Sequence, residues 1–190
     1  MKKRIFTSTE FYVGIVLILL CLLVQIKSGQ FFTGNNAVDL LRAFSVPAMF
    51  CIGEMFVIIT GGVDVSFPAI ASMAMFIVCS QLEHVTDNPL LFFAAAMLIG
   101  LCVGLVNGFI IARFRFPALI VTLGTSSICF GIMQGVFKSR EYPLCQPLYE
   151  LGQMKLLSVT NPVSGLTSDM PVGIILMVLL IFIGWFILER

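Results

Sequence analysis

The chain has 190 residues, of which 59% are hydrophobic and 11% are charged, and its formal net charge is +1. Its mean hydropathy of +1.06 lies far above that of a soluble globular domain, so the composition excludes that class and predicts an all-α, polytopic transmembrane helical bundle. The nearly balanced charge argues against nucleic acid as a partner.

Six apolar stretches are expected to form helices that cross a lipid bilayer. Each approaches the roughly 17–25 residues that span the membrane, and they cover residues 11–26, 46–60, 67–82, 90–112, 119–137 and 172–188. The second and third are the shortest and flank a glycine-rich interruption, so residues 46–82 form either two crossings or one broken or re-entrant pair. Two crossings are favoured, which gives six helices in a single transmembrane domain over residues 1–190.

The start of the chain sets the expected orientation. Cations at positions 2–4 precede the first apolar stretch, as they do in a signal peptide. The stretch is longer than the apolar region of a signal peptide and lacks a small-x-small cleavage site, so we expect that it is not cleaved and forms the first transmembrane helix. The positive-inside rule then places the N-terminus in the cytoplasm. Six crossings put Arg113 and Arg115 on that side and residues 138–170 outside, where the cations of a long loop carry little weight.

The glycine-rich interruption runs from Gly61 to Pro68 and reads Gly-Gly-Val-Asp-Val-Ser-Phe-Pro. Irregular backbone at membrane depth is tolerated only where it is buried in protein or lines a wet cavity, and transporters use such interruptions to hold solutes. Four of its residues are therefore candidates for a solute pathway: Gly61, Gly62, Asp64 and Ser66. Capping of the third helix by Asp64 or Ser66, with Pro68 in its first turn, explains the polar residues equally well.

Glu54 lies in the middle of the second apolar stretch, where a carboxylate is costly unless it is protonated, paired or facing water. Arg42, the basic residue nearest to it in this part of the sequence, is about three helical turns away and too far for a direct pair. We therefore expect Glu54 to face the solute pathway or to hydrogen-bond to a neighbouring helix.

The fourth apolar stretch carries Gly100, Gly104 and Gly108 at a spacing that places them on one helix face. Small residues at this spacing let helix backbones approach closely, so we expect the face to pack tightly against a neighbour. The pattern is common in membrane bundles and indicates nothing about the solute.

Three further polar residues complete the candidates for the pathway: Asn107, Thr122 and Thr125. The Asn107 amide is suited to hydrogen bonding between helices, which is its more common role. The threonine hydroxyls are able to bond solute hydroxyls, or the carbonyls of their own helix one turn back, which is their more frequent fate.

The six cysteines indicate no disulfide framework. Five are spread singly through apolar stretches, where we expect them to behave as small hydrophobic residues, and Cys145 lies in a loop. The sequence has no Cys-x-x-Cys and no Cys/His pairing, so neither a metal site nor a bound cofactor is expected, and His84 is expected to be an exposed loop residue. The nucleotide-binding pattern G-x-x-x-x-G-K-[ST] is also absent, so the chain itself should not hydrolyse ATP.

Three motifs in register resemble one family. They are Thr60-Gly-Gly-Val-Asp-Val-Ser66, Asn107-Gly-Phe-Ile-Ile-Ala-Arg113 and Phe116-Pro-Ala-Leu-Ile-Val-Thr-Leu-Gly-Thr125. They look like the permease subunits of bacterial ABC importers for ribose, xylose, galactose and autoinducer-2. The resemblance implies a non-enzymatic permease of the cytoplasmic membrane that pairs with a second permease subunit, identical or different. It also implies an extracytoplasmic solute-binding protein and an ABC ATPase subunit as partners, the latter using the ATP.

Two features depart from the family's pattern. Where the family usually has Ser-Val-Gly after the acid, this chain has Ser66-Phe67-Pro68, and the proline stiffens the turn. Family members run to roughly twice a domain of this size. The chain is therefore expected to be the N-terminal part of a permease, as a fragment, an interrupted gene or one half of a split subunit.

Two other functions remain open at this stage. One is a self-sufficient proton-coupled carrier, in which the intramembrane acids Glu54 and Asp64 relay protons. The other is a membrane protein that assembles with a partner and transports nothing. The solute is not specified by the sequence, and a pentose or hexose is what the family resemblance implies.

Overall fold

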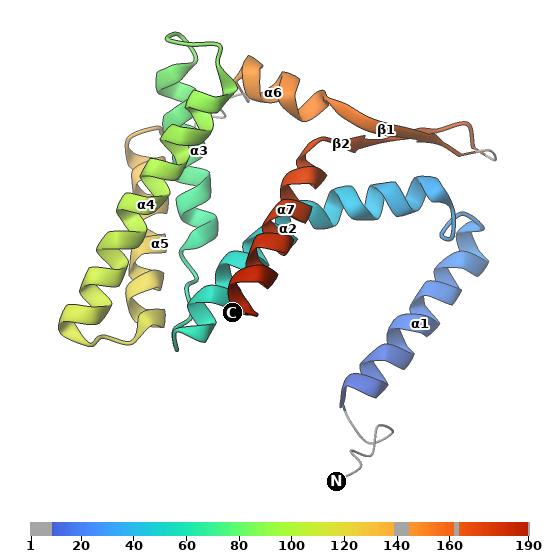
Figure 1. Cartoon of the computed structure of the whole chain (residues 1–190), viewed down its shortest axis with the longest axis horizontal. Coiled ribbons are helices and arrows are strands. Elements are labelled where there is room, and N and C mark those ends of the chain that lie inside the picture. Colours follow the sequence, from blue (N-terminus) through green and yellow to red (C-terminus); the bar gives the residue numbers. More distant parts are fainter. Residues whose placement is uncertain (1–8, 139–144, 162–163, 190) are drawn as a thin grey trace. The chain divides into compact units, whose positions relative to one another are not determined.

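The computed structural model describes residues 9–138, 145–161 and 164–189, and helices dominate this part of the chain (Figure 1). The cations at positions 2–4, which orient the predicted N-terminus, lie outside the described residues. The elements in chain order are α1 (Thr9–Ser28), α2 (Gly34–Ile59), α3 (Phe67–Leu82), α4 (Pro89–Phe114), α5 (Ala118–Gly135), α6 (Gln146–Gln153), β1 (Lys155–Thr160), β2 (Thr167–Pro171) and α7 (Gly173–Leu188).

Each of the six predicted apolar stretches corresponds to one helix, so the predicted all-α polytopic fold is confirmed. Within the described residues, α1, α2, α4 and α5 are long and apolar enough to cross a membrane, whereas α3 and α7 are shorter apolar helices. The helix predicted over residues 46–60 begins earlier, at Gly34, and contains Pro47 in its interior. Its first turns are more polar than the rest, which is why hydropathy alone placed the start too late.

The loop predicted over residues 138–170 contains α6 and the two-stranded sheet of β1 and β2. These short elements lack the long apolar run by which the other helices were recognised. In the hairpin, Lys155 Nζ lies 2.6 Å from Asp169 Oδ2, and Ser158 Oγ donates to Asp169 Oδ1 over 2.6 Å. The bonds from Lys155 and Ser158 lower the pKa of the Asp169 carboxyl.

The described chain divides into two compact units. The first comprises the residues up to Phe44 together with Lys155–Met170, and the second comprises Ser45–Met154 and the residues from Pro171 onward. In the first unit, side-chain amides attach the hairpin to the start of α2. Asn35 Oδ1 accepts from the Ser168 N–H at 2.9 Å, and Asn161 Nδ2 donates to Gln30 Oε1 at 3.2 Å.

The second unit is built around α3, which packs against both α4 and α5 (Figure 1). One hydrophobic cluster joins Ala69, Ile70 and Met73 of α3 to Cys129 and Met133 of α5. A second cluster, toward the other end of α3, joins that helix to α4 and α6; its buried members are Val78, Cys79, Phe92 and Cys145. The two clusters fix α3, α4 and α5 side by side, and this packing positions the polar residues of the unit.

The glycine face of α4, which we expected to pack tightly against a neighbour, is not covered by any other part of the described chain. A methyl group built on Gly100, Gly104 or Gly108 would meet no atom of a non-neighbouring described residue within 4 Å. The helix instead buries the adjacent stripe that contains Phe92 and Asn107. Larger side chains on that stripe gain more contact with α3 and α5 than the bare face would, so they decide which face turns inward.

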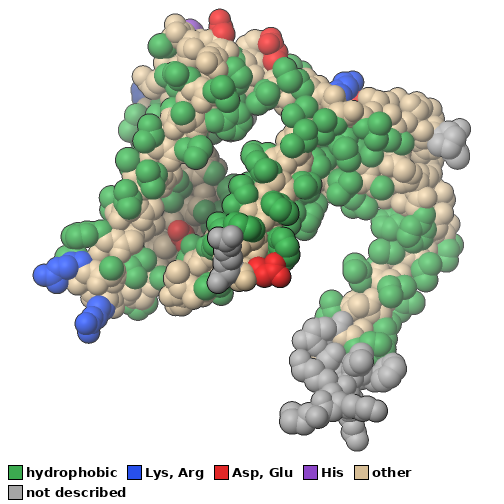
Figure 2. Space-filling model, viewed as in Figure 1, with side chains coloured by type: hydrophobic (Ala, Val, Ile, Leu, Met, Phe, Trp, Pro, Cys, Tyr) green, Lys and Arg blue, Asp and Glu red, His purple; other side chains and the backbone are tan. Residues whose placement is uncertain are grey.

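The outward faces of the helices are strongly apolar. On α4, Leu90 and Met97 are each 74% exposed, and Phe109 is 65% exposed. Figure 2 shows hydrophobic side chains distributed along the helices on the face in view. Exposing apolar surface of this extent to water is unfavourable, whereas a lipid bilayer or further apolar helices would cover it.

Candidate functional site

The break between α2 and α3 (residues 60–66) requires both of its glycines. Gly61 has a φ of +89°, a backbone conformation that residues with a side chain rarely adopt, so a glycine at this position lets the chain turn. Gly62 approaches α5, because a methyl group built on it would lie 3.1 Å from Ala118 Cβ. The first glycine is therefore demanded by backbone conformation and the second by the closeness of another helix.

The Asp64 carboxylate holds the end of the break in a tight turn. Its Oδ1 accepts two hydrogen bonds from Ser66, one from the backbone N–H at 2.7 Å and one from Oγ at 2.6 Å. Ser66 is fully buried and occupies the N-cap position of α3, but among the described residues its own side chain makes no capping bond. Pro68 lies in the first turn as predicted, so α3 begins at a point that Asp64 has organised.

Asn107 of α4 connects the break to α5. Its Nδ2 donates to Ser66 Oγ at 3.2 Å, and its Oδ1 accepts from Thr125 Oγ1 at 2.5 Å. The residue is only 3% exposed, so these bonds compensate an amide that would otherwise be costly to bury. The predicted bonding of this amide between helices is therefore present in the structure.

Thr122 of α5 bonds to the backbone of the same break. Its Oγ1 accepts from the Val65 N–H at 3.3 Å and lies 3.5 Å from the Val63 carbonyl oxygen. It also lies 3.3 Å from the Leu119 carbonyl oxygen of its own helix, the alternative expected from sequence. The side chain is 1% exposed and thus serves as a buried link between α5 and the irregular backbone.

Glu54 joins these residues from the last turns of α2. Its Oε1 accepts from the Asp64 N–H at 3.0 Å. Its Oε2 is the one buried side-chain polar atom of the described residues that has no hydrogen-bond partner. The partner of Oε1 belongs to the break, which differs from the two possibilities expected from sequence, a neighbouring helix or an open pathway. An unpaired buried oxygen is costly, so Oε2 marks the incomplete position of this site.

All eight residues selected from the sequence gather in this one region of the second unit. Six of them form what we call the break network: Glu54, Asp64, Ser66, Asn107, Thr122 and Thr125. Gly61 and Gly62 shape the backbone that the network holds. Sequence reasoning missed Ala118, which faces Gly62, and the backbone groups of Val63 and Val65 that Thr122 contacts. No sequence pattern marks such contacts, because they arise only when the helices pack.

The chemistry of the break network suits it to holding a shape. Most of its donors and acceptors bond to one another, so the irregular backbone is fixed by α4 and α5 rather than left open. No group of three or more His, Cys, Asp and Glu side chains that could hold a metal ion occurs among the described residues. The hydrogen bonds of the network therefore hold residues 60–66 against α4 and α5.

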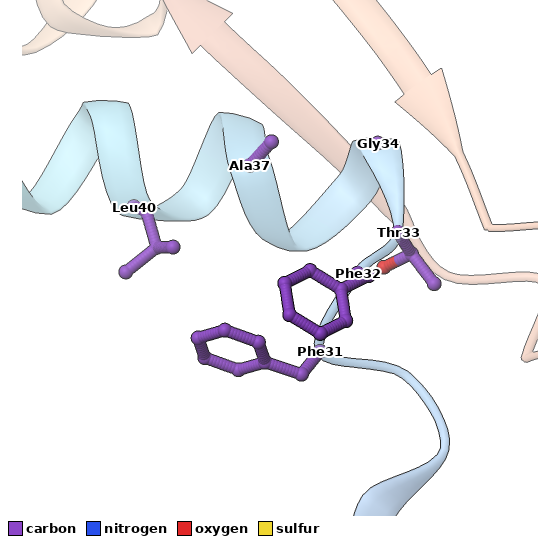
Figure 3. Close-up of a pocket in the computed structure, with 6 residues that line it drawn as sticks. All are labelled: Phe31, Phe32, Thr33, Gly34, Ala37 and Leu40. Carbon is purple, nitrogen blue, oxygen red and sulfur yellow. The ribbon is translucent and has the colours of Figure 1, made fainter. Parts of the chain in front are cut away.

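A separate pocket lies in the first unit, at the start of α2 (Figure 3). All of the residues that line it come from one short segment: Phe31, Phe32, Thr33, Gly34, Ala37 and Leu40. Figure 3 shows that the largest of the lining side chains are the two phenylalanine rings and Leu40. The pocket contains none of the break network and one polar hydroxyl, so it offers little to recognise a polar solute.

Replacing Glu54 tests how the carboxyl contributes. Glu54→Gln keeps an acceptor for the Asp64 N–H and is expected to leave the thermal stability of the purified protein nearly unchanged. Glu54→Leu leaves that N–H without its partner, at a cost of about 1–3 kcal/mol, and is expected to lower the midpoint of thermal unfolding in detergent. Glu83→Leu, at an exposed position of the link between α3 and α4, is the control. Wild-type stability and uptake in Glu54→Leu would show that the carboxyl has neither role.

Comparison with known proteins assigns the chain to a family of transport proteins. A family model described as "Branched-chain amino acid transport system / permease component" matches residues 36–190, a range that includes the whole break network. The chain is 35% identical to the ribose import permease protein RbsC of Escherichia coli (strain K12) over 118 residues, which is 62% of this chain and 36% of that protein. No solved structure matches the chain.

Two further relatives match over more of the chain. The ribose import permease protein RbsC of Haemophilus influenzae is 28% identical over 176 residues, covering 92% of this chain and 52% of that protein. The autoinducer 2 import system permease protein LsrC of Photorhabdus luminescens is 24% identical over 186 residues, covering 97% and 53%. The matched part of this chain thus spans between about a third and a half of the length of these curated relatives.

Proposed function

Because the chain belongs to the family of branched-chain amino acid transport system permease components, we propose that it acts as membrane-spanning sequence of a permease subunit in an ATP-driven importer. The relatives are named for import of ribose and of autoinducer 2, which supports a small polar solute, in particular a sugar. Because the matched part of the chain spans between about a third and a half of these relatives, the activity is proposed for the permease subunit that contains this segment.

The observation that carries the proposal is the break between α2 and α3. Irregular backbone between apolar helices survives in a membrane only where protein encloses it or water reaches it. Here Asn107 and Thr122 enclose it from two other helices. Residues 60–66 are therefore proposed to contribute to the path of the solute as an irregular segment that α4 and α5 hold in one shape.

The proposed importer needs partners that supply energy and deliver the solute. The chain has no nucleotide-binding motif, so ATP is bound and hydrolysed by an ABC ATPase subunit. An extracytoplasmic binding protein delivers the solute, and a second permease subunit, identical or different, forms the other half of the pathway. The exposed apolar faces of α4, including the open glycine face, offer surface for helices outside this segment or for lipid.

The distribution of charge in the second unit supports a cytoplasmic position for the Arg113 end of α4, and the proposed count of six crossings then puts the N-terminus on the same side. Arg113 and Arg115 lie where α4 passes into α5, and Figure 2 shows Lys or Arg side chains at that end of the helices. Glu83 and Asp87 lie in the link between α3 and α4, at the end of the helices opposite to Arg113. This end is acidic except for one nearby cation, Lys138, which follows α5. By the positive-inside rule the Arg113 end faces the cytoplasm.

A reporter fused after Arg115 is expected to be cytoplasmic, and one fused within residues 146–165 is expected to be outside. The side of the membrane is measured at each site with paired fusions of alkaline phosphatase and a cytoplasmically active fluorescent protein, because each reporter is active on one side only. Opposite results at both sites would contradict the six-crossing topology.

Co-purification tests the proposed function. The permease subunit that contains this segment, tagged at the native locus and extracted in a mild detergent, is expected to retain an ABC ATPase subunit and, after cross-linking, an extracytoplasmic binding protein. An unrelated multi-pass protein with the same tag is the control. Uptake by the isolated chain in a proton gradient would instead favour a proton-coupled carrier that uses Glu54 and Asp64, and the absence of both results would favour an assembly protein.

A further inference from the structure

Two cysteines that are far apart in the sequence meet at one end of α3. Cys79 lies in the last turns of α3, and Cys145 directly precedes α6. Their Sγ atoms are 3.0 Å apart, and the residues are 3% and 0% exposed. Cys79, which the sequence places singly in an apolar stretch, therefore lies beside a second free thiol in the fold.

The pair lies inside a packed cluster that joins three helices. Val78 and Phe92 are buried beside the two cysteines, and Leu148 of α6 packs against the same cluster. Through Leu148, α6 therefore packs against the ends of α3 and α4. On the exposed side of α6, the Gln146 side chain donates a hydrogen bond to Glu150. The cysteines occupy the point at which α6 attaches to the bundle.

We propose that Cys79 and Cys145 form a disulfide bond that fastens α6 to the extracytoplasmic end of α3. The end that carries the pair also carries the link with Glu83 and Asp87, opposite to the end with Arg113. The proposal rests on the orientation given under the proposed function, which places this end outside. Disulfides form and persist in that compartment, whereas cytoplasmic thiols are kept reduced.

The reaction joins the two Sγ atoms and removes two protons and two electrons. The oxidant is the disulfide of an extracytoplasmic thiol oxidase protein, which accepts the electrons through a mixed disulfide and leaves as a dithiol. Burial and the hydrogen bond with Cys79 raise the pKa of the Cys145 thiol to about 11, so the closed cluster holds little of the reactive thiolate at neutral pH. The exchange therefore takes place while the chain folds, and the finished bond is shielded from reductants.

The test counts thiols in the permease as it exists in cells. Cells are quenched in acid, free thiols are blocked with N-ethylmaleimide in denaturant, and the protein is then reduced and treated with a maleimide of high mass. The wild type is expected to gain two tags after reduction. Cys79→Ser and Cys145→Ser are each expected to gain no tag from this pair after reduction. The control is Cys129→Ser, which removes a buried cysteine of α5 away from the pair and is expected to gain both tags.

A reporter fused after Glu150 separates the two ways in which the proposal fails. No gain of tags in the wild type with the reporter outside would overturn the disulfide and leave the orientation intact. A cytoplasmic reporter with no gain of tags would overturn both together. Loss of the two tags in cells that lack the extracytoplasmic thiol oxidase would support the proposed route of oxidation, and their retention there would overturn that route.

Discussion

Asp64→Ala is expected to abolish uptake by the permease subunit that contains this segment, while the affinity of the binding protein for solute stays unchanged. In the wild type, both donors of Ser66 bond to one Asp64 oxygen, at 2.7 and 2.6 Å. Ser66 is fully buried, so each donor that loses its partner costs about 1–3 kcal/mol. The turn that starts α3 then loses its organising side chain, and the break no longer keeps one shape.

Transport by the reconstituted importer, measured beside solute binding by the isolated receptor, gives the result. Asp64→Asn keeps an acceptor oxygen and is expected to retain part of the uptake. Asp87→Ala, at an exposed position of the link between α3 and α4, removes an acid outside the break network and is expected to transport normally. Normal transport by Asp64→Ala would show that residues 60–66 are only a connecting turn.

Asn107→Leu is expected to give the largest loss of stability among single changes in α4. The amide joins Ser66 of the break to Thr125 of α5 and is almost completely buried. Leucine has a similar size, so the loss comes mainly from the Thr125 hydroxyl, which is left without its acceptor at a cost of about 1–3 kcal/mol. Ser66 Oγ loses the bond from Asn107 but still donates to Asp64. A lower midpoint of thermal unfolding in detergent and a weaker attachment of α4 to α5 should follow.

A double-mutant cycle isolates this bond. Asn107→Leu and Thr125→Val are expected to couple by about 0.5–3 kcal/mol, because the second change adds little once the first has removed the shared bond. The matched control pairs Asn107→Leu with Ser127→Ala, whose hydroxyl bonds to the Leu123 carbonyl of its own helix at 3.0 Å, and additivity is expected there. Additivity in both cycles would contradict the link between α4 and α5.

The sequence predicted the helices well because lipid demands long apolar runs, and such runs are visible residue by residue. It also predicted the region of interest, since Gly61, Asp64 and Pro68 interrupt apolar sequence where lipid-exposed backbone would be unstable. The polar residues of α4 and α5 were recognised for the same reason. Their assembly around the break became visible only with the packing of α3 against both helices.

Other features could not be predicted because they depend on contacts between distant segments. The nearness of Cys79 to Cys145 follows from the attachment of α6, a helix too short to be recognised by hydropathy. The glycines of α4 marked a face that is able to pack closely, but spacing does not say whether another part of the same chain covers it. The early start of α2 was missed because its first turns are polar.

The break network decides between two roles that the sequence left open for its residues. Contact with solute and hydrogen bonding within the protein were both considered from the sequence, and in the structure Asp64, Ser66, Asn107 and Thr125 are engaged with one another. Their contribution to transport is proposed to be indirect, through the fixed shape of residues 60–66. Glu54 Oε2 is the exception, because this buried oxygen has no hydrogen-bond partner among the described residues.

Uptake of radiolabelled sugars into proteoliposomes tests the central claim most directly. The vesicles contain the permease subunit with this segment, its ABC ATPase and its binding protein, with a panel of pentoses and hexoses supplied outside. Uptake of at least one sugar is expected to require both ATP inside and binding protein outside, and to be unaffected when the proton gradient is collapsed. Uptake that persists without ATP and binding protein but stops when the gradient is collapsed would contradict assignment to an ATP-driven importer.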